Sequence, residues 1–195
     1  FTHLQPEEAD NPLGESTGAG VIFGATGGVT EAALRSAYYL LFKKDLPADA
    51  LVFEQVRGVQ GVREATLDFE GTAVRIAVVH GLSNANEVLD KLIAGGEYHW
   101  IEVMGCPGGC VGGGGQPYAG AGAVPLDECL LAQRASALYN LDAEREIRCS
   151  HHNPSIQKLY EEYLGEPLGH KAHELLHTYY YPRVPMGVRP QEAQV

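Results

Sequence analysis

Two cysteines of this chain lie in a short stretch that is half glycine, MGCPGGCVGGGGQP at residues 104–117. Cys106 and Cys110 are separated by Pro-Gly-Gly. Thiolates bind metals strongly, and close cysteine spacings with glycine are typical of iron–sulfur ligand runs. Glycine lets the backbone approach a bound group and direct N–H groups at its sulfur atoms. The stretch indicates a metal-cluster loop, although CxxxC alone also fits a flexible loop with two unpaired thiols.

Zinc is the other metal that this cysteine pair could bind. A structural zinc site needs two further ligands, and the adjacent His151 and His152 could supply them. Zinc does not require the glycine-rich sequence GGCVGGGGQP around and after the second cysteine. The glycine content therefore favours an iron–sulfur cluster, and the residues alone leave zinc as the alternative.

A second glycine-rich segment, GAGVIFGATGG, resembles a dinucleotide-binding loop only superficially. Gly18 and Gly20 precede the expected strand, whereas the nucleotide fingerprint places its glycines after a strand. No acidic residue that could bind a ribose is evident about twenty residues further on. The sequence therefore does not favour nucleotide binding.

The remaining cysteines and the C-terminal histidines have simpler interpretations. Cys129 lies in a predicted helix between leucines, which is typical of a buried core thiol, and Cys149 is interpreted as structural. His170, His173 and His177 have helical spacing. This spacing permits metal binding, but packing near a helix end is the expected role.

Hydrophobic patterns predict the elements that must position the cysteine loop. A buried strand at Val21–Phe23 precedes a glycine turn and a helix from about Val29 or Thr30. Glu70-Gly71 is a typical two-residue hairpin turn. Three β-like segments, two of them joined by this turn, lie at residues 51–58, 61–69 and 72–82.

The second half of the pattern continues the alternation of helices and strands. Ser83 or Asn84 is the expected cap of a helix that ends at residues 95–96. The strand YHWIEVM then runs directly into the cysteine loop, at the strand end where α/β sheets bind ligands. Three further helices are expected at residues 125–144, 150–165 and 170–180, the first with one apolar side formed by Leu126, Leu130, Ala137 and Leu141.

These elements predict an α/β fold with a mixed, largely parallel sheet and flanking helices, followed by a C-terminal helical segment. The predicted organisation is an irregular arm at residues 1–17, an α/β lobe at 18–125 with the loop 104–117, helices at 126–181 and an extended tail at 182–195.

Composition excludes several classes of protein. The 195 residues are 45% hydrophobic and carry a formal net charge of −11, which argues against nucleic acid as a partner. No apolar run reaches the length of a membrane span. The start FTHLQPEEADNPLGE is polar and acidic, unlike a signal peptide, and four cysteines are too few for a disulfide scaffold. A cytoplasmic location is therefore expected.

The cysteine stretch VMGCPGGCVGGGGQP resembles the third cysteine signature of the iron-only, or [FeFe], hydrogenases. IFGATGGVTEAALR is similar to a preceding segment of that family, and NPSIQKLYEEYLGEPLGHKAHELLHTYY resembles its closing helices. Gly105 stands where alanine is common, and Thr30 where methionine is common. The first two signatures, TSCCP-like and MPC-like, are missing, so the chain resembles the second half of the family's catalytic domain.

The resemblance implies a role for five residues at the family's active site, the H-cluster. Cys106 would bind a [4Fe–4S] cubane, and Cys110 would bind the cubane and bridge to a di-iron unit that carries CO, cyanide and a dithiolate. Met104 and Phe23 would line the di-iron pocket, and Gly24 would bring backbone close to the diatomic ligands. Cys110, Met104 and Phe23 are thus the implied catalytic residues.

The implied activity is reversible oxidation of H2 to protons and electrons. The chain would be a subunit or fragment that is active only with a partner carrying the other two cluster cysteines. Further iron–sulfur or flavin subunits could carry electrons, with ferredoxin, NAD(P) or both as acceptor. Two alternatives are a non-catalytic iron–sulfur scaffold or assembly protein and an H2-sensing hydrogenase subunit.

Overall fold

The chain divides into two units, Phe1–Ile156 and Gln157–Val195, and the cysteine loop lies in the first. The structure is a computed structural model. It describes residues 3–10, 13–14, 16–47, 50, 52–53, 56–58, 60–118, 120, 122, 124 and 126–181. Among these residues, no helix combines the length and apolar character that crossing a membrane requires. The predicted tail at 182–195 lies outside the described residues.

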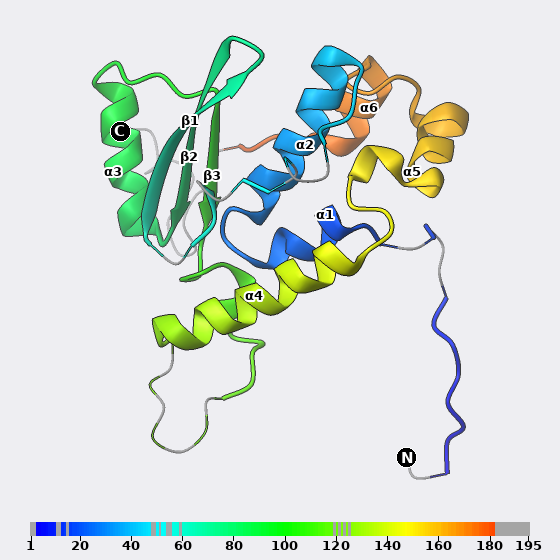
Figure 1. Ribbon diagram of the computed structural model, residues 1–195, viewed down its shortest axis with the longest axis horizontal. Helices are drawn as coiled ribbons and strands as arrows, with labels where there is room; N and C mark the ends of the chain where they lie inside the picture. Colours follow the sequence, from blue (N-terminus) through cyan, green and yellow to red (C-terminus); the bar gives the residue numbers. More distant parts are fainter. Residues whose placement is uncertain are drawn as a thin grey trace, which may run out of the picture. The chain divides into compact units, whose positions relative to one another are not determined.

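A three-stranded mixed sheet forms the centre of the first unit (Figure 1). Strand β1 (Val62–Phe69) pairs antiparallel with β2 (Thr72–His80), and β2 pairs parallel with β3 (Trp100–Met104). The predicted hairpin is confirmed, because Glu70 and Gly71 join the first two strands with positive φ angles of 53° and 88°. Such angles match the right-handed twist of paired strands.

Helices cover both faces of this sheet, as Figure 1 shows for α2 (Gly28–Phe42) and α3 (Leu82–Ile93). Alternate residues of β2 point to opposite faces. Ile76 and Val78 belong to the core cluster that includes Leu34 of α2, whereas Ala77 and Val79 pack with Val88 of α3. The nearly continuous apolar sequence of β2 is explained by this double coverage.

The start of the lobe is helical, so the predicted strand at Val21–Phe23 is wrong. The residues instead form a short helix α1 (Gly18–Val21) and a 3-10 turn η1 (Ile22–Gly24). Thr17 caps α1 by accepting a hydrogen bond from the Gly20 amide at 3.1 Å. Ala19 and Ile22 are completely buried, so the apolar side chains of this segment pack into the core from helical turns rather than from a strand.

Two other predictions from the sequence, the cap of a helix and a β-like segment, differ from the structure. Helix α3 begins after Gly81, without a side-chain cap from Ser83 or Asn84. The predicted β-like segment at 51–58 has no strand among its described residues, and positions 51, 54 and 55 lie outside them.

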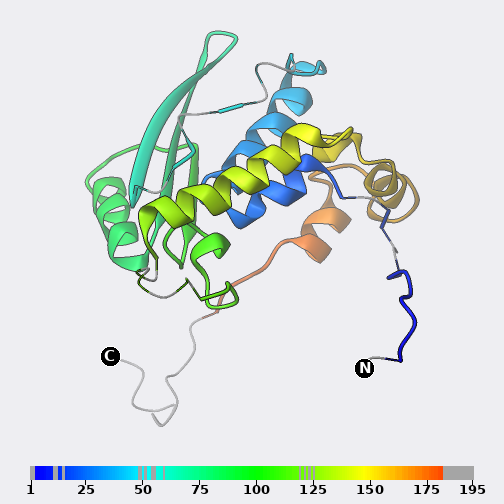
Figure 2. The ribbon, with the colours of Figure 1, turned by 60° about the horizontal axis from the view of Figure 1, so that its bottom comes forward.

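Helix α4 (Glu128–Glu144) crosses α1 (Figure 2), and its buried residues are not those of the predicted apolar side. Three residues of the predicted apolar side are exposed: Leu126, Ala137 and Leu141. Leu131 and Asp142 are buried instead. The helix turns this face inward because Asp142 pairs with arginines inside the unit.

The exposed side of α4 also carries Cys129, so its prediction as a buried core thiol is wrong. Beyond α4, the 3-10 turn η5 (Ser150–His152) precedes α5 (Pro154–Leu159), and Oδ1 of Asn153 accepts a hydrogen bond of 2.9 Å from the Ser155 amide in its first turn. The second unit contains the π-helical turn η6 (Tyr160–Leu164) and α6 (His170–Leu176).

Candidate metal centre

The cysteine loop leaves the sheet at the end of β3 and folds into a tight turn. The Gly109 amide donates to the Cys106 carbonyl at 3.0 Å, and Cys110 begins the 3-10 turn η4 (Cys110–Gly112). Gly108 and Gly109 have φ angles of 73° and 89°, which side chains disfavour. A Cβ on Gly109 would lie 2.8 Å from the Thr26 amide nitrogen, so close packing also requires glycine there.

Both loop cysteines are exposed and free of disulfides. Their sulfur atoms are therefore accessible to a bound metal group. The other two thiols differ in position: Cys129 is exposed on α4, and Cys149 is buried. Burial raises the pKa of the Cys149 thiol, which disfavours the thiolate that a metal would need.

The segment before α2 lies against this loop. The Thr26 amide donates a hydrogen bond of 2.9 Å to the Gly108 carbonyl. This contact brings the turn that contains Phe23 and Gly24 beside the loop that follows Met104. The structure thus places the predicted site residues on two adjoining segments, with Phe23 exposed and Met104 half-buried.

Gly24 has a packing role that the sequence did not indicate. A Cβ at this position would lie 2.8 Å from Cδ1 of Leu138 on α4. Glycine therefore lets α4 approach the turn closely, whatever else its backbone contacts.

Glu102 is a buried residue of the site region that the sequence analysis missed. Its carboxylate accepts hydrogen bonds from the Gly27 and Thr30 amides at 2.7 Å each, and from the Thr30 hydroxyl at 2.6 Å. Trp100 also donates to the Thr30 hydroxyl, at 3.0 Å. The carboxylate stabilises the N-terminus of α2 and ties it to β3, two residues before Met104. An isolated acid in the apolar strand WIEVM was the available signal.

A buried ion network holds α2 against α4 behind these segments. Arg35 pairs with Glu31 at 2.6 Å and with Asp142 at 2.8 Å, and all three side chains are fully buried. Arg57 adds a contact of 2.7 Å to Glu31, and Arg148 one of 2.7 Å to Asp142. Burial acts to raise the pKa of Asp142, but hydrogen bonds from the two arginines outweigh it and lower that pKa.

Arg134 of α4 supports the part of the loop that follows Cys110. Its guanidinium donates to the carbonyls of Val111 at 2.9 Å and Pro117 at 2.8 Å. Gln116 donates to the Cys110 carbonyl at 3.2 Å. These hydrogen bonds hold the glycine-rich second half of the loop in place, because its glycines have no side chains that could pack.

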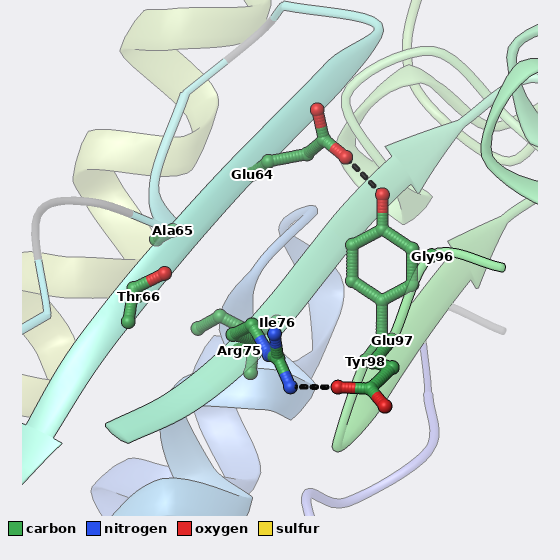
Figure 3. A pocket seen from close by; sticks show the side chains of 8 residues that line it. All are labelled: Glu64, Ala65, Thr66, Arg75, Ile76, Gly96, Glu97 and Tyr98. Atoms are coloured by element: carbon green, nitrogen blue, oxygen red, sulfur yellow. Dashed lines mark hydrogen bonds and ion pairs between the residues drawn. The ribbon is translucent and has the colours of Figure 1, made fainter. Parts of the chain in front are cut away.

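The hollow shown in Figure 3 lies away from the cysteines, on β1, β2 and residues 96–98. Its volume is about 300 Å³. The charged side chains that line it already have partners: Arg75 pairs with Glu97, and Glu64 accepts a hydrogen bond from the Tyr98 hydroxyl. It contains none of the predicted site residues, so it is not part of the candidate metal centre.

Family models match both halves of the chain. Residues 1–114 match the iron only hydrogenase large subunit, C-terminal domain, and residues 128–183 match the iron hydrogenase small subunit. The first model covers more than half of the chain and includes the cysteines Cys106 and Cys110.

Known proteins extend this similarity over nearly the whole sequence. The chain is 50% identical over 183 residues to the NADP-reducing hydrogenase subunit HndD of Solidesulfovibrio fructosivorans, which is 94% of this chain and 30% of that protein. It is 31% identical over 191 residues to Protein NAR1 of Arabidopsis thaliana, which is 94% of this chain and 39% of that protein.

A solved structure confirms the predicted fold class. A variant of [FeFe]-hydrogenase HydA1 from Chlamydomonas reinhardtii matches with a TM-score of 0.63 at 43% identity, over 91% of this chain and 50% of that one. The chain thus spans about a third of HndD and half of the HydA1 chain. It belongs to the iron-only hydrogenase family, with its first part matching the large subunit's C-terminal domain and its last part the small subunit.

Proposed function

We propose that this chain is one half of an [FeFe]-hydrogenase catalytic domain and contributes Cys106 and Cys110 to an H-cluster. The proposal depends on one arrangement above all. An exposed two-cysteine loop leaves β3 and is joined to the glycine turn before α2 through Thr26 and Gly108. Soft thiolate ligands in a glycine-rich loop suit an iron–sulfur cluster.

The cysteines of this chain supply only some of the ligands that a [4Fe–4S] cluster needs. A cubane needs four protein ligands, whereas the loop supplies two thiolates. Cys149 is buried away from solvent and Cys129 lies on the exposed side of α4. The hydroxyl of Thr26 is buried without a hydrogen-bond partner among the described residues. Thr26 is also the residue whose amide donates a hydrogen bond to the loop. A group bound beside the loop would provide a partner for it.

The remaining two ligands would come from a partner chain that carries the missing cysteine signatures. Exposed apolar side chains support such a partner, among them Phe23, Val103 and Ile93. We infer a hetero-oligomer with the cluster at the interface between this chain and its partner. Further iron–sulfur or flavin subunits would deliver electrons to the cluster. All four cysteines are free, which suits a reducing cytoplasm.

Each residue of the site has a proposed role in this arrangement. Cys106 and Cys110 would hold the cubane, and Cys110 would also hold the di-iron unit. When bound, the H-cluster supplies the redox chemistry that interconverts H2 with protons and electrons. Met104 and Phe23 form apolar walls that exclude water, and Gly24 permits close approach of the backbone. Glu102 is a positioning residue, because it fixes β3 against α2 beside the loop.

An iron–sulfur assembly role is the second candidate, because the chain is also 32% identical over 160 residues, 81% of its length, to the cytosolic iron-sulfur assembly component 3 of Mus musculus. A protein of that kind would keep the cysteines as cluster ligands without a di-iron unit. Both candidates predict iron at Cys106 and Cys110, but only the hydrogenase predicts metal-bound CO and cyanide.

Co-expression separates these possibilities. The chain is produced alone and with a partner that carries TSCCP-like and MPC-like signatures, in a host that matures [FeFe]-hydrogenases. We expect iron, CO and cyanide infrared bands and H2 activity in the copurified pair and none of them in the single chain. Iron without those bands would support the assembly role. A full cubane and activity in the single chain would refute the need for a partner.

A further inference from the structure

Three potential metal ligands converge at a place separate from the cysteine loop. Asp45 Oδ1 lies 2.7 Å from His152 Nε2 and 3.1 Å from His151 Nε2. The three ligand atoms all lie within 4.8 Å of one another. Asp45 follows the end of α2, whereas both histidines belong to η5, more than a hundred residues later. The fold therefore assembles this group from two distant segments.

Surrounding contacts hold the imidazole rings in place. The Tyr39 ring stacks on His151 with centroids 4.3 Å apart and an interplanar angle of 10°. Ser36 Oγ lies 3.1 Å from Nδ1 of His151, the ring nitrogen that faces away from Asp45. The turn itself is closed by a hydrogen bond of 3.1 Å from the His152 amide to the Cys149 carbonyl. Both histidines thus present Nε2 to the same carboxylate oxygen.

We propose that Asp45, His151 and His152 bind a divalent transition-metal ion of the zinc type. Two imidazole nitrogens and one carboxylate oxygen are a common three-residue ligand set for such ions. Tetrahedral bonds of 2.0–2.1 Å place ligand atoms about 3.3 Å apart, so Asp45 Oδ1 needs to move away from His152 Nε2 by about 0.6 Å and from His151 Nε2 by about 0.2 Å, while the two imidazole nitrogens already lie within 4.8 Å of each other. The metal would replace the protons that the imidazoles now share with Asp45.

Exposure and outer contacts complete the site. Asp45 and His152 are exposed, which leaves solvent access for the ion and for a water molecule in the fourth position. Ser36 forms a hydrogen bond with Nδ1, the second ring nitrogen of His151. Outer hydrogen bonds of this kind orient metal-binding histidines. A bound ion would connect the end of α2 to η5 and so stabilise the segment that leads into α5.

The test uses Co2+ as the probe, added to the purified full chain that carries Cys106→Ser and Cys110→Ser, so that the loop thiolates cannot bind the probe. We expect one ion bound with the visible d–d bands of nitrogen and oxygen ligands, and without a thiolate-to-cobalt charge-transfer band. His152→Gln keeps an N–H donor for Asp45 but removes the imidazole ligand. Ser36→Ala should weaken binding by about 10-fold, and His152→Gln should weaken it more than the roughly 100-fold upper range of outer-contact losses.

The control is the double variant His173→Gln with His177→Gln, which removes another stacked histidine pair, with centroids 4.5 Å apart. It should bind Co2+ as the chain with the two serine substitutions alone does. Asp45→Asn provides a second ligand variant, which retains an oxygen acceptor for the histidines. The proposal is overturned if either ligand variant, folded by circular dichroism, binds Co2+ as tightly as that chain, if the spectrum shows thiolate ligands, or if the control alone abolishes binding.

Discussion

At the scale of single residues, position decides what each thiol can do. Cys110 and Cys129 are both exposed, but only Cys110 lies in the glycine loop. We expect Cys110→Ala in the copurified complex to lose the di-iron infrared bands and to reduce H2 activity to background, because the bridging thiolate is removed. Cys129→Ser is the matched control and should retain both. Activity in the Cys110 variant near that of wild type would contradict its assignment as the bridging ligand.

Glu102 is a residue whose importance lies in its hydrogen bonds. Glu102→Gln places an amide NH2 where the carboxylate accepts three hydrogen bonds, so one buried donor loses its acceptor. We expect the free energy of unfolding to fall by about 1–3 kcal/mol. Glu97→Gln, at an exposed position near the same strand, should change it by less than about 0.5 kcal/mol. Urea unfolding measures both, and equal effects would show that the Glu102 contacts contribute little.

At the scale of elements, the cysteine loop keeps its shape through backbone conformations that only glycine adopts easily. Gly109→Ala adds a Cβ 2.8 Å from the Thr26 amide nitrogen at a φ of 89°. We expect a cost on the order of 1–3 kcal/mol and weaker retention of iron, because the loop must move away from the turn before α2. Gly114→Ala has nothing within 4 Å of its Cβ and serves as the control. The measurements are the iron content of the copurified complex after gel filtration and its melting temperature; equal iron retention in both variants would contradict the prediction.

At the scale of the whole first unit, the ion network of Arg35, Glu31 and Asp142 joins α2 to α4. Removing one partner of a buried ion pair leaves an uncompensated charge. Asp142→Asn should therefore lower the free energy of unfolding by about 3–5 kcal/mol near neutral pH. Glu144→Gln, exposed on the same helix, is the control and should change it little.

The pH dependence follows from the direction of the Asp142 shift. The arginines lower the pKa of Asp142 in the folded state, so its contribution is complete above the ordinary aspartate pKa of about 3.9 and is lost as the pH falls through the lower folded value. The difference between wild type and Asp142→Asn should be the same at about pH 7 and pH 5, and smaller at about pH 3. Urea unfolding at these pH values tests this, and a difference that does not shrink in acid would show that Asp142 is not the titrating group.

Local patterns by themselves determined a large part of this protein. The Glu70-Gly71 turn, the double-sided apolar strand β2, the helix α2 and the two-cysteine loop after β3 all follow from short sequence signals. Turn chemistry and hydrophobic period act between near neighbours, so a short window contains the information. The cysteine signature is also specific enough to indicate the family, because the spacing of the thiols and the glycines around them is itself a local property.

Tertiary structure decided what depends on partners distant in the chain. Val21–Phe23 has the composition of a strand, yet this segment forms helical turns that contact the distant helix α4, and Ile22 is completely buried there. The inward face of α4 is set by pairing of Asp142 with Arg35, 107 residues away, rather than by its leucines. Asp45 and His152 are likewise 107 residues apart. Hydrophobic period predicts that a side is apolar, but the free energy of buried charge pairing depends on which segments the fold brings together.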